Sequence, residues 1–149
     1  MTHSDKAVQL FSQRYHCSQA VFAAFAEEMG LDQTTALKIG GCFGCGMNKG
    51  EVCGACTGAL MTIGLKYGQG SVDDMAARAK SSNLCVRFLD EFAKNNGLYL
   101  CKELLGYDIT QPDQLAAVKE AGLFTEFCPK MVESAAKILD EIIQSEEQL

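Results

Sequence analysis

The spacing of apolar residues, which follows a helical period along most of the chain, is the feature that most constrains the fold. In the C-terminal segment Met131, Ala135, Ile138 and Ile142 lie 4, 3 and 4 residues apart, with charged residues between them. This spacing places them on one face of an α-helix, whereas a half-buried strand requires strict alternation. Strand signals are nearly absent elsewhere, so the sequence predicts an all-α fold.

Capping residues and glycines divide the chain into expected helices. We expect helices to start near Ser4 and near Cys17, to begin again at Ser71 or Asp73, and to span 32–39, 51–67, 101–105, 113–121 and the segment after Cys128. The 149 residues contain no internal repeat or linker. The prediction is therefore one domain, 1–149, a helical bundle of five or more helices with a Gly- and Cys-rich loop at 40–50.

Charge and hydropathy exclude several classes of partner. Lys and Arg total 13 and Asp and Glu total 19, which gives a net charge of −6. Such a chain has no basic footprint for nucleic acid or for an anionic membrane surface. Its longest apolar runs, such as 20–26, fall far short of the roughly 20 residues of a membrane span, and no apolar signal segment follows Met1. We therefore expect a cytoplasmic protein that binds neither nucleic acid nor membrane.

Cysteine is the residue type that carries chemical information here. The chain has eight cysteines: Cys17, Cys42, Cys45, Cys53, Cys56, Cys85, Cys101 and Cys128. In a reducing compartment, cysteines bind metal or exchange electrons more often than they form structural disulfides. The alternative for any one of them is a small buried apolar side chain, and Cys85, between Leu84 and Phe88 on an apolar stripe, is expected to be such a core residue.

Four of these cysteines fall at expected helix starts. Cys17, Cys53 and Cys101 begin helices, and Cys128 precedes Pro129, which favours the first helical turn. The free N–H groups and the dipole of a helix start favour thiolate over thiol, and thiolate is the form that ligates metal. Convergence of the four helix starts would create an anionic four-sulfur pocket.

A second, local set has the pattern Cys42-x2-Cys45-x7-Cys53-x2-Cys56. Paired C-x-x-C motifs suit zinc and iron–sulfur clusters alike, since both take four thiolates. The surrounding glycines, including Gly54 and Gly58 on one helix face, leave room for close helix packing or for a bulky cofactor. Haem attachment is excluded because no His follows either motif, and a thioredoxin-like fold is disfavoured by the absence of a βαβ pattern.

Four motifs follow one another in order: Cys17-Ser-Gln-Ala-Val, Cys53-Gly-Ala-x-x-Gly-Ala-Leu-Met, Cys101-Lys-Glu-Leu-Leu-Gly and Cys128 in the last segment. In them the chain resembles the C_GCAxxG_C_C family of redox-active proteins over nearly its whole length. The resemblance implies a helical domain, a redox role and functional cysteines at the same four helix starts. The chain departs from the family pattern at Cys42 and Cys45, where a Gly- or Ala-rich loop is usual, and at Cys56, which fills a variable position.

The two histidines are weaker candidates. His16 precedes Cys17 and is either a ligand, a group that lowers the pKa of that thiol, or simply a partly exposed side chain. His3 lies in an expected frayed terminus and suggests no function.

Three functional hypotheses remain open from the sequence. The first is an iron–sulfur or similar thiolate-metal centre for electron transfer or a small reductive reaction, with Cys17, Cys53, Cys101 and Cys128 as first ligands and Cys42, Cys45 and Cys56 as second candidates. The second is metal-free thiol–disulfide exchange by a C-x-x-C dithiol, and the third is structural or stored zinc. The sequence names no substrate, catalytic residue or redox partner. Because Cys53 belongs to both cysteine sets, we predict one continuous centre nucleated by Cys53, with Cys85 outside it.

Overall fold

The computed structural model describes residues 1–149 and contains nine α-helices and no strands, which confirms the predicted all-α fold. The α-helices are α1 (His3–Ser12), α2 (Cys17–Ala26), α3 (Gln33–Gly40), α4 (Gly54–Tyr67), α5 (Met75–Asn96), α6 (Cys101–Leu105), α7 (Pro112–Glu120), α8 (Leu123–Glu126) and α9 (Cys128–Glu147). A 3₁₀ turn, η1 (Glu27–Met29), extends α2, and an irregular turn, η2 (Gly46–Gly50), precedes α4.

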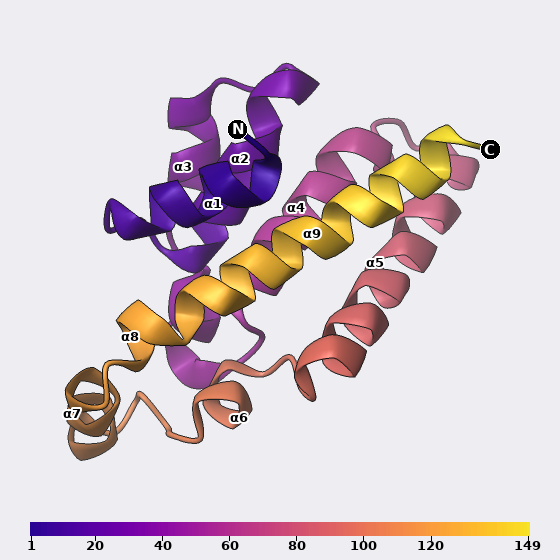
Figure 1. Ribbon diagram of the computed structural model, residues 1–149. Coiled ribbons are helices and arrows are strands. Elements are labelled where there is room, and N and C mark those ends of the chain that lie inside the picture. The colour runs from indigo at the N-terminus through magenta and orange to yellow at the C-terminus, as the bar shows by residue number, and fades with distance from the viewer.

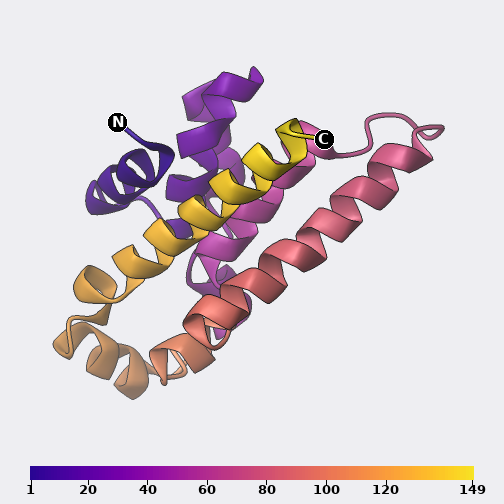
Figure 2. The same ribbon diagram turned by 45° about the vertical axis from the view of Figure 1, so that its right-hand side comes forward.

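Helix α2 is the centre of the bundle. Apart from Cys17 and Gln19, each of its residues is buried, so it is apolar on all sides, as expected of a helix surrounded by others. Helices α1, α3, α4 and α9 pack around it. Figure 1 shows α1–α3 on one side of α9 and α5 on the other, with α4 running behind α9, and Figure 2 shows α5 as the outermost long helix. Helices α6, α7 and α8 gather at one end of the molecule, where α9 begins (Figure 1).

The helix pattern read from the sequence matches the structure where a local signal is strong. The predicted stripe of α9 is buried, together with Val132, Ala136 and Leu139. Asp32 caps α3 through the N–H of Thr35, and Gly30 and Gly106 adopt the left-handed conformation after η1 and α6.

Several expected helix boundaries were wrong. Thr2, not Ser4, caps α1, because its hydroxyl accepts the N–H of Asp5 while the Asp5 carboxylate accepts the N–H of Thr2. Asp74, not Ser71 or Asp73, caps α5. Helix α4 begins three residues later than position 51, because residues 51–53 are extended and pair with residues 99–101.

Two side chains lie elsewhere than the sequence suggested. Cys85 is half-buried beside the stripe of α5, whose buried members are Leu84, Phe88 and Phe92, so it is not a fully buried core residue. His3 is not frayed: its ring stacks on Phe25 at 4.1 Å and forms contacts with two carboxylates. No helix of the structure has both the length and the apolar character that crossing a bilayer requires.

Candidate thiol site

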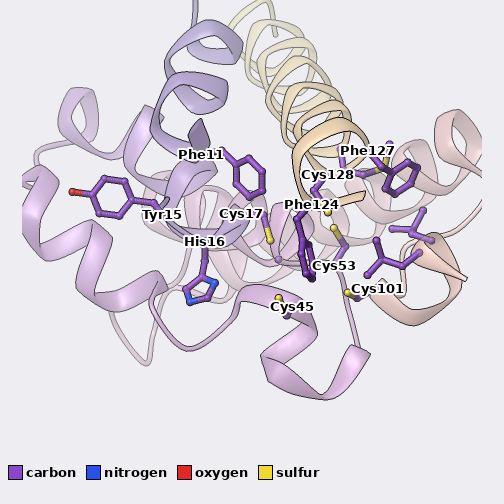
Figure 3. Close-up of a pocket in the computed structure, with 14 residues that line it drawn as sticks. Phe11, Tyr15, His16, Cys17, Cys45, Cys53, Cys101, Phe124, Phe127 and Cys128 are labelled. Atoms are coloured by element: carbon purple, nitrogen blue, oxygen red, sulfur yellow. The ribbon is translucent and has the colours of Figure 1, made fainter. Parts of the chain in front are cut away.

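Five cysteines line one cavity of about 200 Å³ at the end of the bundle where α6–α8 gather. They are the four helix-start cysteines and one from the glycine-rich loop: Cys17, Cys45, Cys53, Cys101 and Cys128. Figure 3 shows their sulfur atoms grouped beneath the first turn of α9. The structure therefore brings together all four cysteines that the helix-start argument selected; whether they ligate a metal remains a prediction.

Each of the four occupies the start of its helix in a similar way. Cys17, Cys101 and Cys128 are the first residues of α2, α6 and α9, and Cys53 is the residue immediately before α4. Pro129 follows Cys128 in the first turn of α9, where the missing N–H of proline costs no helical hydrogen bond. Side chains at helix starts from four separate parts of the chain thus meet at one end of the fold.

A short antiparallel bridge fixes Cys53 beside Cys101. The N–H of Cys53 donates to the carbonyl oxygen of Tyr99 at 2.8 Å, and the N–H of Cys101 donates to that of Glu51 at 2.6 Å. Val52 and Leu100 form the bridge between them. These two hydrogen bonds hold the starts of α4 and α6 side by side, although 47 residues lie between the two cysteines in the chain.

Cys45 reaches the cavity through an unusual left-handed turn. Its φ is 55°, and φ is 61° at Gly46, 57° at Met47 and 58° at Asn48. This left-handed conformation costs a non-glycine residue roughly 1–2 kcal/mol of conformational free energy. Residues that adopt it nevertheless cluster at functional sites. The turn directs the Cys45 side chain into the cavity, and the backbone N–H groups of Cys45 and Ser18 lower the pKa of the Cys17 thiol.

Glycines allow the loop, α2 and α4 to approach within contact distance. A Cβ on Gly54 would overlap the sulfur of Cys17, and a Cβ on Gly44 would lie 2.5 Å from the ring of His16. One turn further along α4, a Cβ on Gly58 would lie 2.6 Å from the carbonyl oxygen of Ser18. The Gly54/Gly58 face of α4 therefore serves close packing on α2 and on the glycine-rich loop; room for a cofactor stays a prediction.

The remaining three cysteines lie outside the cavity. Cys56 is fully buried in α4, where its thiol raises the pKa of Cys53. Cys42 is exposed, and Cys85 lies on α5. The local set of Cys42, Cys45, Cys53 and Cys56 is therefore not gathered as a unit, because only its second and third members line the cavity.

Burial raises the pKa of the thiols in the cavity. It is the main cause at Cys101 and at Cys128, whose pKa values rise to about 12, and neighbouring cysteines add to it. At Cys17 the hydrogen bond to Cys53 is the largest cause of a pKa raised well above its ordinary value, followed by burial. At Cys53 the hydrogen bond from Cys17 lowers the pKa, but the hydrogen bond to Cys56 and burial outweigh it and the pKa is raised. The N–H groups at the helix starts do lower the pKa of Cys17 and of Cys53, as expected, but burial and neighbouring thiols outweigh them in the metal-free protein.

The wall opposite the thiols is apolar. Its side chains, which the sequence analysis did not single out as site residues, are Phe11, Tyr15, Leu104, Leu105, Phe124, Phe127 and Met131. The one available signal was the position of Phe124 and Phe127 just before Cys128. His16 lines the rim and is exposed, and no Asp, Glu, Lys or Arg lines the cavity. The wall therefore places apolar groups and no formal charge beside the sulfurs.

The thiols are spread around the cavity and do not meet at one point. No three Cys, His, Asp or Glu side chains lie close enough together to enclose a single ion. A tetrahedral zinc site, with Zn–S bonds of about 2.3 Å, holds its sulfurs about 3.8 Å apart. The wider arrangement suits a group that is larger than one ion.

Fold and site together define a small helical protein in which cysteines from several helices line one cavity with an apolar wall. This chain belongs to the C_GCAxxG_C_C family, described as "Putative redox-active protein (C_GCAxxG_C_C)", whose sequence profile matches residues 15–142. Searches of curated proteins and of solved structures each found no match. The match covers every cysteine of the cavity, and the family description agrees with the redox role that the resemblance implied.

Proposed function

We propose that the protein is an electron-transfer protein that holds an iron–sulfur cluster in the thiol cavity, with Cys17, Cys53, Cys101 and Cys128 as ligands. The observation that carries the proposal is the grouping of five thiols from separate elements around one cavity of about 200 Å³. A cluster is a larger body than a single zinc ion and accepts thiolates from well-separated positions. The spread of the sulfurs supports a cluster over structural zinc.

The raised thiol pKa values support a metal-containing site. A buried thiolate is costly without a compensating charge, and a cation supplies that charge and deprotonates the thiols that coordinate it. Without such a cation, thiols with a pKa of about 12 at Cys101 and Cys128 are almost entirely protonated at neutral pH and are poor nucleophiles.

The surrounding residues have separate roles in this proposal. The N–H groups of Cys45 and Ser18 lower the pKa of Cys17, and such groups, when they donate to a ligating sulfur, raise the reduction potential of a cluster. Phe124, Phe127 and the rest of the apolar wall exclude water. A cluster held there would supply reversible electron transfer. Cys45 is a fifth sulfur in contact with the site, available beyond the four ligands that a cluster takes.

The test is anaerobic purification followed by iron and acid-labile sulfide analysis and a visible spectrum. We expect iron and sulfide in equal amounts and a broad charge-transfer band. Cys53→Ser should remove all of the metal, whereas Cys85→Ser, the same substitution outside the cavity, should leave metal content and spectrum intact. A colourless protein without iron, even after cluster reconstitution, would contradict the proposal. Retention of half the metal by Cys53→Ser would indicate two sites.

One observation favours a second function, metal-free thiol–disulfide exchange. The thiols of Cys17 and Cys53 shift each other's pKa, and the thiol of Cys56 raises the pKa of Cys53, so each has a thiol neighbour. All eight cysteines are free thiols in the structure, as a reducing compartment such as the cytoplasm would keep them. This function predicts a reversible loss of two protons per disulfide, observed by mass spectrometry in graded redox buffers.

A further inference from the structure

A second hollow lies directly beside the thiol cavity and shares a wall with it. This outer groove, of about 610 Å³, is lined by Val8, Phe11, Ser12, Arg14, Tyr15, Phe124, Thr125 and Pro129. Three of its aromatic residues, Phe11, Tyr15 and Phe124, also line the thiol cavity. The groove and the cavity are therefore separated by a single layer of aromatic side chains from α1, the turn after it, and α8. Its volume lies within the roughly 300–1,000 Å³ of small-molecule sites.

The chemistry of the groove differs from that of the cavity. Its lining includes three aromatic residues and two hydroxyl residues, Ser12 and Thr125, and Arg14 is its one charged residue. Arg14 forms no ion pair in the structure, and no carboxylate lines the groove. The chain as a whole carries a net charge of −6, but at this groove the unpaired Arg14 can bind a negative group beside an aromatic surface.

The backbone at Arg14 is an independent sign of a functional position. Arg14 follows the end of α1 with a φ of 78°, a left-handed conformation that glycine usually supplies after a helix. A residue with a side chain is disfavoured there, so Arg14 occupies a position where glycine would be more stable. Strain of this kind is retained where the side chain is needed.

From these observations we propose that the outer groove binds a flat, conjugated, redox-active small molecule that carries a negative group, with Arg14 recognising the charge and Phe11, Tyr15 and Phe124 contacting the ring system. The identification of the ligand as redox-active rests on the proposed function, because the groove adjoins the thiol cavity. The binding itself depends only on the groove.

The experiment uses anthraquinone-2-sulfonate as the probe and isothermal titration calorimetry with the metal-free protein. Menadione serves as an uncharged quinone and methyl viologen as a flat cation. We expect saturable binding of the sulfonate, weaker binding of menadione and no binding of methyl viologen. Because metal content is measured separately, loss of cluster binding and loss of probe binding are distinguishable.

Arg14→Gly is the decisive variant. It removes the cation and relieves the left-handed strain, so the variant should unfold at the same temperature as the parent or higher, while its affinity for the sulfonate falls by about tenfold or more. Arg78→Ala, at an exposed arginine on α5 without an ion pair, is the matched control and should bind normally. Phe124→Leu should weaken the sulfonate and menadione alike. Equal affinity of Arg14→Gly and the parent for the sulfonate, or equal affinity of the parent for sulfonate and viologen, would overturn the proposal.

Discussion

Helix α4 contacts α2 in two adjacent regions. Each has a glycine at the contact, but one region belongs to the core and the other to the thiol cavity. At Gly58 the two helices close completely, and the glycine faces the backbone carbonyl of Ser18. At Gly54, one turn earlier, the glycine faces the sulfur of Cys17, and beyond that contact the helix starts leave a cavity. Two glycines four residues apart therefore predict a close approach, but they do not identify what approaches. One approach builds the core and the other builds the site.

The largest effect on stability is expected at the closed contact. Gly58→Ala places a Cβ 2.6 Å from a backbone oxygen that cannot rotate away, so α2 and α4 must separate. We expect a loss of about 3 kcal/mol in the free energy of unfolding, measured by urea denaturation. Under the proposed function, iron per folded chain should fall less than in Gly54→Ala, because the new Cβ meets the backbone of Ser18 and not a thiol. An unchanged unfolding free energy would mean that this contact is looser than described.

Gly54→Ala tests the other side of the comparison. Its Cβ overlaps the sulfur of Cys17, which is a side-chain atom, and also lies 3.1 Å from Gly44 Cα. A side chain can turn away more cheaply than a backbone, so the unfolding free energy should fall by less than at Gly58. Under the proposed function, iron per chain should fall sharply because the sulfur leaves its position. If Gly54→Ala and Gly58→Ala lose stability and iron to the same extent, the two regions are not separate.

The opposite end of the bundle provides a third region for comparison. His3 Nδ1 lies 2.7 Å from Asp140 of α9, His3 Nε2 lies 2.9 Å from Glu28 of η1, and the ring stacks on Phe25 of α2. His3→Ala should cost about 1–2 kcal/mol of unfolding free energy with no change in metal content. Gln9→Ala, at an exposed side chain of the same helix, is the control and should leave stability nearly unchanged. A loss of metal in His3→Ala would show that the two ends are coupled.

The cavity thiols should make stability depend on alkaline pH. Cys101 and Cys128 have pKa values of about 12 in the folded protein and an ordinary value of 9.0, so their protonated forms are favoured by folding. Their contribution is complete below about pH 9 and is lost as the pH rises towards 12. In metal-free, reduced protein, the urea midpoint should therefore fall between pH 8 and about pH 10. The fall should be shallower in Cys101→Ser/Cys128→Ser, because serine does not titrate; equal slopes would contradict the prediction.

Local rules explain how much of this architecture the sequence could predict. The bounds of α6, Cys101–Leu105, followed from the spacing of Cys101 and Gly106, and the helix starts that carry cysteines followed from caps and proline. The position of Cys45 did not follow, because no local rule places Cys45, Met47 and Asn48 in a left-handed turn. The bridge that joins Val52 to Leu100 was also missed, since a single non-local pair leaves no periodic signal. Conversely, helical geometry accounts for the position of Cys56. It follows Cys53 by three residues, about one helical turn, and so lies in the buried first turn of α4 and not at the cavity.

The smallest expected effect has the opposite sign and lies further along α4. Gly64 is exposed in the interior of this helix, and a Cβ there would meet nothing within 4 Å. Gly64→Ala should therefore raise the free energy of unfolding by about 0.5–1 kcal/mol, because alanine loses less backbone entropy in a helix than glycine does. Metal content and probe binding should not change. The substitution is the same as at Gly58, on the same helix, so opposite signs at the two positions would attribute the loss at Gly58 to its contact with Ser18. A loss at Gly64 as well would instead mean that α4 does not tolerate alanine for reasons unrelated to α2.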